Sequence, residues 1–229
     1  MFFWDPTYIV LLPAVALALY AQWRVRSTYA RYSQVPIANG LTGAEAASEI
    51  LRRRGMPGVR IERIDGSLTD HYDPRARVLR LSTDVYTGAS VAAVGVAAHE
   101  SGHAIQDAEH YGPLALRSAI VPVTQFGSWL AWPIFLLGFL FHSGTFMQLG
   151  ILIFSAFVAF TVITLPVEFD ASRRALRVLA AEHLMTDGEL RGVRAVLGAA
   201  ALTYVAAAAM AILQLLRLLM LFGMSRREE

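Results

Sequence analysis

The sequence predicts a mainly α-helical membrane protein, with about four transmembrane helices and a small α+β domain on the cytoplasmic side. The 229 residues are 55% hydrophobic, and their mean hydropathy is +0.47, which points away from an ordinary soluble domain. Apolar runs close to the length that crosses a hydrocarbon core of ~30 Å alternate with polar stretches rich in arginine. This alternation predicts membrane helices joined by segments outside the bilayer.

The composition narrows the chemistry that the chain can perform. It has no cysteine, so thiolate metal sites and disulfides are excluded, and any metal must be held by His, Asp or Glu. All 20 basic residues are arginine, and the formal net charge is only +2. Because no cluster of basic and aromatic residues accompanies this small charge, no nucleic-acid partner is expected.

The first apolar run covers residues 8–23 and predicts a span that is not cleaved. A secretory signal peptide carries its positive charges before the apolar run, whereas here Arg24, Arg26 and Arg31 follow it. Arginines collect on the cytoplasmic side of a membrane. We therefore expect the N-terminus outside and residues 24–120 in the cytoplasm.

The polar region that follows begins with signals for a helix and a strand. Thr42 and Glu45 have the spacing of a capping box, and Gly55 follows arginines at the expected end of the helix. Residues 59–64 then alternate apolar and charged side chains, as a half-buried strand does.

Two further short strands are expected about an Asp-Pro turn near Asp73. The second, at residues 77–82, would be an exposed edge that pairs with an extended peptide. The alternative is an ordinary hairpin that only covers the neighbouring helix.

Residues 91–109 carry the pattern on which the functional hypothesis depends. They predict a helix capped by Ser90, in which His99 and His103 lie one turn apart on the same face. Two imidazoles at this spacing can bind one metal ion. Glu100 lies about 100° round the helix axis, where it can act on a water molecule without being a ligand. The His-Glu-x-x-His pattern is typical of zinc metalloproteases.

The alternative for this pattern is a helix with two buried histidines and an incidental glutamate. Burying such polar side chains in a helix of Ala, Val and Gly costs free energy unless something pairs them. Gly95 and Gly102 each lower helix propensity by roughly 1 kcal/mol relative to alanine, so we expect another element to approach the helix closely there. Both features favour the metal site.

Two apolar runs follow, at residues 121–141 and 146–165, with an uncharged turn between them. Each is near the length of a span, so together they predict a transmembrane hairpin. Thr186 and Glu189 form a second capping box, which precedes a last apolar run at residues 195–222.

The arginines between the hairpin and the last run place that segment in the cytoplasm. Arg217, late in the last run, is expected to extend its guanidinium to the interface. Two arginines in the tail, residues 226–229, leave open that the last run lies in the interface instead of crossing. The predicted regions are a first span (1–23), a cytoplasmic α+β region (24–120), a transmembrane hairpin (121–166), a cytoplasmic helix (167–194), and a last span with the tail (195–229).

A catalytic zinc site needs three protein ligands and an open position, so the histidine pair is incomplete. The third ligand must lie on the same side of the membrane, and a two-span hairpin returns the chain to that side at Pro166. This proline suits the first turn of a new helix. Glu168 lies next to the membrane boundary and is the predicted third ligand, whereas Asp170 lies about 200° away round the helix. The alternative for Glu168 is a first-turn glutamate favoured by the helix dipole.

Three other side chains compete for this role. Asp107 lies one turn beyond His103 and would more naturally orient that histidine. His110 is similar to the third histidine of a longer metalloprotease pattern, but the position of that histidine holds Glu109 here. His183 lies near a helix end, where a histidine is more often a cap or a surface residue.

The segments LTDHYDP, VLRLS, HESGH and PVEFDASRRA, with a transmembrane hairpin before the last, resemble bacterial membrane-bound neutral zinc metallopeptidases of the YugP type. The more distant HtpX and CAAX-protease-like membrane peptidases are similar in having a histidine pair and, after a two-span hairpin, a glutamate ligand. The resemblance implies a zincin-like domain in which His99, His103 and Glu168 bind zinc and Glu100 is general base and then general acid.

In those distant relatives an aspartate lies four residues after the glutamate ligand, where this chain has Ser172. We therefore expect Asp107 or Asp170 to replace it as the partner of the first histidine. No residue matches a transition-state stabiliser. The candidates for that role are His71, Tyr72, His110 and His183.

The sequence thus predicts a multi-pass zinc endopeptidase of the gluzincin type in the cytoplasmic membrane, which cuts peptide or membrane-protein substrates at the cytoplasmic face. Glu100 would take a proton from the attacking water and pass it to the leaving amine. One alternative is a site-2-type protease that cuts inside the bilayer, which the apolar residues 92–98 would permit. The other is a non-enzymatic membrane scaffold with a closed zinc site, in which His110 or Asp107 is the fourth ligand.

Overall fold

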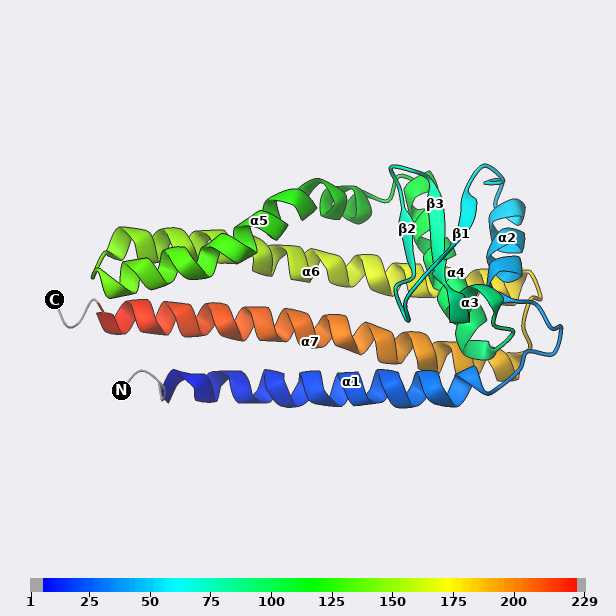
Figure 1. The fold of residues 1–229 in the computed structure, drawn as a ribbon, viewed down its shortest axis with the longest axis horizontal. Helices are drawn as coiled ribbons and strands as arrows, with labels where there is room; N and C mark the ends of the chain where they lie inside the picture. Colours follow the sequence, from blue (N-terminus) through cyan, green and yellow to red (C-terminus); the bar gives the residue numbers. More distant parts are fainter. Residues whose placement is uncertain (1–5, 226–229) are drawn as a thin grey trace. The chain divides into compact units, whose positions relative to one another are not determined.

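The computed structural model describes residues 6–225, except for the side chains of residues 122, 123, 125, 126 and 128. It is mainly helical with one small sheet, as predicted (Figure 1). The helices are η1 (Pro6–Leu11), α1 (Leu12–Ser33), α2 (Gly43–Arg53), α3 (Thr83–Thr87), α4 (Val91–Ala108), α5 (Gly112–Leu140), α6 (Gly144–Ala181) and α7 (Asp187–Ser225). The strands are β1 (Arg60–Ile64), β2 (His71–Asp73) and β3 (Val78–Ser82).

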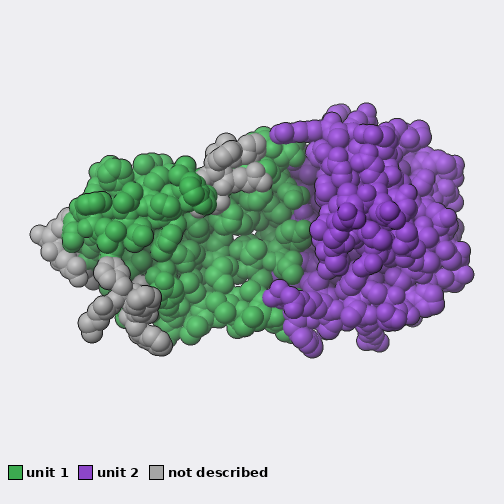
Figure 2. Space-filling view, in the orientation of Figure 1, with its two compact units in different colours: residues 1–21, 115–166, 203–229 green, residues 22–114, 167–202 purple. Residues whose placement is uncertain are grey.

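The chain forms two compact units, which Figure 2 colours separately. Unit 1 contains residues 1–21, 115–166 and 203–229, and unit 2 contains residues 22–114 and 167–202. Unit 2 therefore holds the whole sheet and α4. The five regions expected from the sequence remain a prediction.

The residues predicted to cap and end the helices of unit 2 do so in the structure. The Thr42 hydroxyl accepts a hydrogen bond from the Glu45 backbone N–H, and the Glu45 carboxylate accepts one from the Thr42 N–H at 2.8 Å, so the capping box of α2 is confirmed. Gly55 follows with a φ of +71°, a left-handed conformation that glycine adopts without a steric penalty. At the start of α4, the Ser90 hydroxyl accepts from the N–H three residues on, again as predicted.

The three strands form one mixed sheet in the order β1-β3-β2, and the turn expected at Asp73 joins β2 to β3. β3 pairs with both neighbours, in parallel with β1 and antiparallel with β2. The expectation that residues 77–82 form an exposed edge is therefore wrong. β3 is the most apolar strand, and Val78, Leu79 and Leu81 are buried, whereas the more polar β1 and β2 take the edges, where charged side chains are tolerated.

α4 packs against α2, α3 and the sheet, and its two glycines mark close contacts with two further helices. A Cβ at Gly102 would lie 2.5 Å from the Ala171 carbonyl oxygen of α6, and a Cβ at Gly95 would lie 3.2 Å from a methyl group of Val193 in α7. Both distances are shorter than ordinary van der Waals contact, so the predicted close approach of another element is confirmed. The contact at Gly102 places α4 directly against α6.

Three helical segments within the described residues are long and apolar enough to cross a membrane, namely Pro6–Ser33, α6 and α7. Within α5, Gly112–Val121 and Trp129–Leu140 are apolar but shorter, so the predicted fourth span remains a prediction. α7 follows the second capping box, which is confirmed because the Glu189 carboxylate accepts from the Thr186 N–H at 2.6 Å. The tail, residues 226–229, lies outside the described residues.

The prediction that a new helix begins at Pro166 is wrong, because α6 continues through this proline to Ala181. A proline inside a helix costs ~3 kcal/mol. Among the residues after it, Val167 and Leu179 are fully buried in unit 2, each with 0% exposure. Burying two such side chains contributes about 1.5–3 kcal/mol each, which offsets the cost and lets the helix continue.

Arg217 also differs from expectation, since its side chain is buried within unit 1 instead of extending to an interface. Its Nε donates to the Thr7 hydroxyl at 3.0 Å, and its guanidinium lies 3.7 Å from the centroid of the Tyr8 ring. A hydroxyl acceptor and an aromatic face inside the unit replace water as partners of this cation.

Candidate metal centre

α4 and α6 bring together, within unit 2, the three side chains predicted as metal ligands. The rings of His99 and His103 lie one turn apart on α4, with centroids separated by 4.8 Å and planes at 82°. The Oε2 atom of Glu168 on α6 lies 3.2 Å from His99 Nε2 and 3.6 Å from His103 Nε2. Glu168 is 2% exposed and His103 is 8% exposed, so the donor atoms meet away from bulk water.

The spacing of these donor atoms fits a zinc ion. Two ligand atoms that each lie ~2.1 Å from a tetrahedral ion are about 3.4 Å apart, and the two distances to Glu168 lie on either side of that value. A set of two imidazoles and one carboxylate is also a common donor set of catalytic zinc sites. Within the described part of the chain, no other group of three or more His, Asp or Glu donors lies as close together.

Glu100 adds a second buried carboxylate beside the histidine pair, with 8% exposure. Burial lowers the pKa of His103, but its hydrogen bond to Glu168 and the charge of Glu100 outweigh burial and raise the pKa above its ordinary value. The same two negative charges favour a cation at this position. The part of Glu100 in proton transfer stays a prediction.

Ser172, which differs from the aspartate of the distant relatives, contacts the second ring nitrogen of His99. The Ser172 hydroxyl lies 3.1 Å from His99 Nδ1, so serine takes the place of the expected aspartate. The expectation that Asp107 or Asp170 replaces it is wrong. Asp107 instead accepts a hydrogen bond from the Tyr72 hydroxyl at 2.9 Å, because that side chain faces β2.

The second nitrogen of His103 is bonded by Gln106, which was not predicted from the sequence. Gln106 Oε1 lies 3.0 Å from His103 Nδ1, and the side chain is completely buried. A sequence signal was present: a long amide side chain three residues after a ligand, in an otherwise small and apolar helix, lies on the face of that ligand.

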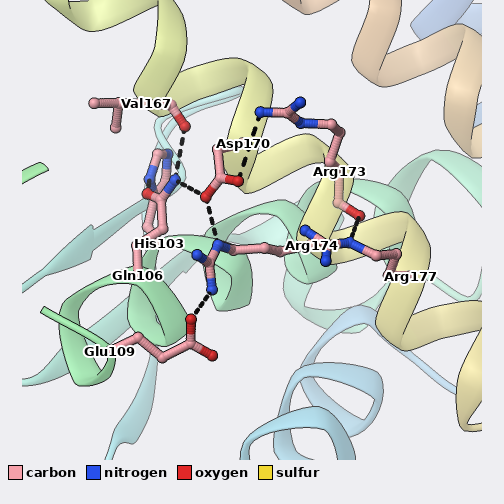
Figure 3. A network of polar contacts seen from close by, with 8 residues as sticks. All are labelled: His103, Gln106, Glu109, Val167, Asp170, Arg173, Arg174 and Arg177. Atoms are coloured by element: carbon pink, nitrogen blue, oxygen red, sulfur yellow. Dashed lines mark hydrogen bonds and ion pairs between the residues drawn. The ribbon is translucent and has the colours of Figure 1, made fainter. Parts of the chain in front are cut away.

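Gln106 links His103 to a charged network that spans α4 and α6 (Figure 3). Its Nε2 donates to the Val167 carbonyl and to Asp170 Oδ2, both at 2.9 Å. Asp170 pairs with Arg174, which also pairs with the carboxylate of Glu109, the residue just after α4. The helix turn that carries Glu168 is thus tied to α4 through side chains that do not contact the metal position.

His110 and His183 are not part of this group. Each lies just past the end of a helix with a φ of 52°, and their backbone N–H groups bond back to the carbonyls of Asp107 and Ala180. These are helix-terminating positions. Neither residue belongs to the close group of metal donors, and a role for either as stabiliser stays a prediction.

The two remaining candidates lie on β2. His71 is exposed, and its Nδ1 bonds the Thr69 carbonyl at 2.9 Å. Tyr72 is half-buried, and burial together with the hydrogen bond to Asp107 raises the pKa of its hydroxyl to about 12. Tyr72 therefore stays protonated, and its partner Asp107 lies one helix turn after His103 on α4.

Comparison with known proteins points to the same metal. The sequence profile of the family described as "Putative neutral zinc metallopeptidase" matches residues 7–223. The chain is 48% identical to "Putative membrane protease YugP" of Bacillus subtilis (strain 168) over 218 residues, which are 95% of this chain and 97% of that protein. No solved structure matches the chain significantly.

Proposed function

The chain belongs to this family of neutral zinc metallopeptidases, and we propose that it is a membrane-bound zinc endopeptidase of the gluzincin type. The observation that carries the proposal is that donor atoms of His99, His103 and Glu168 lie within 4.8 Å of one another, with the Glu168 carboxylate 3.2 and 3.6 Å from the two imidazole nitrogens. With three protein donors, a fourth position remains for water or substrate, as catalysis requires.

Four residues of this chain have separate roles in the proposed peptide hydrolysis. His99, His103 and Glu168 would hold the ion, which when bound lowers the pKa of a water molecule and polarises the scissile carbonyl. Glu100 removes a proton from the attacking water as the water oxygen forms a bond to the carbonyl carbon. It then delivers that proton to the departing amine as the C–N bond breaks.

The edge strand β2 is the best support for an extended substrate. β3 is paired on both sides, whereas β2 pairs with β3 alone among the described strands and contacts α4. The Tyr72–Asp107 hydrogen bond fixes β2 beside the metal helix. A peptide that pairs with β2 would therefore run alongside α4, since backbone pairing at a sheet edge aligns an extended chain.

We place the site at the cytoplasmic face on two observations. Arg24, Arg26 and Arg31 follow the first apolar run, and further arginines lie near the end of α6 and the start of α7, as the positive-inside rule requires for cytoplasmic segments. α4 is not among the helices long and apolar enough to span a membrane and packs on a sheet, which favours a site outside the bilayer over intramembrane cleavage.

The proposal is tested by Glu100→Gln in the full-length protein in detergent or nanodiscs. We expect zinc content to stay near one ion per chain while hydrolysis of casein or a quenched fluorescent peptide falls by about 10²–10⁴-fold, the usual contribution of a general base. Glu62→Gln, on the edge strand β1, is the matched control and should keep full activity. Undiminished hydrolysis by zinc-loaded Glu100→Gln would contradict the mechanism, and zinc binding without any chelator-sensitive hydrolysis in the native protein would support a scaffold instead.

A further inference from the structure

Gln106 is a buried amide that the proposed chemistry does not use. It lies three residues after His103 on α4, is 0% exposed, and makes three hydrogen bonds (Figure 3). Its Oε1 faces His103 Nδ1 at 3.0 Å, and its Nε2 faces the Val167 carbonyl and Asp170 Oδ2 at 2.9 Å each.

The partners of Gln106 allow only one orientation of its amide. A backbone carbonyl can only accept a hydrogen bond, and so can the Asp170 carboxylate, which is paired with Arg174. The NH2 group of Gln106 must therefore face both of them, and the amide oxygen must face His103. If the amide were flipped, an oxygen would oppose two acceptors.

This orientation decides which nitrogen of His103 carries hydrogen. An amide oxygen only accepts, so His103 Nδ1 must be the donor. A neutral imidazole has one N–H, which leaves the lone pair on Nε2, the atom that lies 3.6 Å from Glu168 Oε2. The tautomer needed for metal binding is thus set by a hydrogen bond at the opposite side of the ring.

The same side chain also acts on the third ligand. The Val167 carbonyl belongs to the residue just before Glu168, so the Gln106 hydrogen bond fixes the turn of α6 that presents the carboxylate. Asp170 is held in turn by Arg174, whose guanidinium lies 5.5 Å from the Tyr111 ring and pairs with Glu109. One amide therefore couples a ligand on α4 to a ligand on α6.

We propose that Gln106 is a positioning residue of the metal centre, which holds His103 in its Nδ1–H tautomer and fixes the position of Glu168, while Asp170 and Arg174 fix the orientation of Gln106. This inference rests on the zinc binding that the proposed function requires and not on peptide hydrolysis.

The first test is Gln106→Met, a side chain of similar length without hydrogen-bonding groups, in the full-length protein. We expect zinc affinity, measured by competition with a chromogenic chelator, to fall by about 10- to 100-fold, and the visible absorption spectrum of the cobalt-substituted protein to change. Ser101→Ala is the control: Ser101 is equally buried on α4 but bonds only the Ala97 carbonyl. An unchanged zinc affinity and cobalt spectrum in folded Gln106→Met would overturn the proposal.

The second test needs no variant at position 106 and no metal. ¹⁵N NMR of the metal-free native protein, labelled at histidine and kept at a pH where its ¹⁵N shifts no longer change on further addition of base, should show neutral His103 with Nδ1 protonated and Nε2 bare. The His103→Asn protein assigns the resonance. Observation of the opposite tautomer would overturn the proposal even if Gln106→Met failed to fold. A native protein that binds zinc but hydrolyses no peptide would contradict the proposed function and leave this inference standing.

Discussion

Gly102 of α4 lies against the backbone of Ala171 of α6, so closely that a Cβ at residue 102 would be 2.5 Å from the Ala171 carbonyl oxygen. His103 is the next residue on one helix, and Glu168 lies one turn before Ala171 on the other. The absence of a side chain at position 102 therefore sets the distance between the helices that supply the ligands.

Gly102→Ala should weaken zinc binding and lower stability. The added methyl group meets backbone, which cannot rotate away, so α6 must shift relative to α4, and overpacking of this kind costs about 1–3 kcal/mol. We expect a lower melting temperature together with a weaker affinity for zinc. Gly198→Ala in α7 is the control, because a Cβ there meets nothing within 4 Å and helix propensity alone favours alanine by roughly 1 kcal/mol. Equal behaviour of the two variants would contradict the close contact.

Ser172→Ala should reduce zinc affinity without unfolding the protein. The change removes the partner of His99 Nδ1, and loss of such a partner typically weakens metal binding by about 10- to 100-fold. Ser172→Asp should bind zinc at least as tightly as the native protein, because a carboxylate is a stronger partner of an imidazole N–H. Chelator competition measures both, and a native-like affinity of Ser172→Ala would show that the serine contact has no role.

Zinc should stabilise the protein more at alkaline than at acidic pH. The pKa of His103 is raised above its ordinary value of 6.5, so in the metal-free protein the stability from the protonated His103–Glu168 pair is fully present below 6.5 and is lost as pH rises through the raised value. Zinc requires the neutral imidazole. The increase in melting temperature on adding zinc should therefore be small below pH 6.5 and should grow as the pH rises through the raised pKa of His103.

His142→Asn, which changes a histidine outside the site, should show the same pH profile as the native protein. An increase that is independent of pH in the native protein would exclude His103 as a ligand.

The orientation in the membrane can be measured with single cysteines, because the native chain has none. Thr145→Cys, at the start of α6, and Asp187→Cys, at the start of α7, both replace exposed residues. A membrane-impermeant maleimide should label position 145 but not position 187 in intact cells, and both after lysis. Labelling of position 187 from outside would place the metal centre on the other face.

The sequence by itself determined the features that depend on residues close together in the chain. The helical repeat placed His99 and His103 on one face, and both capping boxes are exchanges between residues three apart, which form whatever the rest of the chain does. Glu168 was singled out by counting spans, which needs only hydrophobic length. Each of these inferences uses a few consecutive residues or the thickness of a bilayer.

Only the tertiary structure decided the features that depend on contacts between segments far apart in the chain. Residues 77–82 became the central strand because β1 and β2 both pair with them, and α6 continues through Pro166 because the residues after it are buried. Ser172 reaches His99, and α6 orients the amide of Gln106, because α4 and α6 touch at Gly102. Such contacts depend on the packing of whole elements, so the residues that hold the proposed ligands in place follow from the fold. The proposed ligands themselves could be predicted from local spacing and membrane topology.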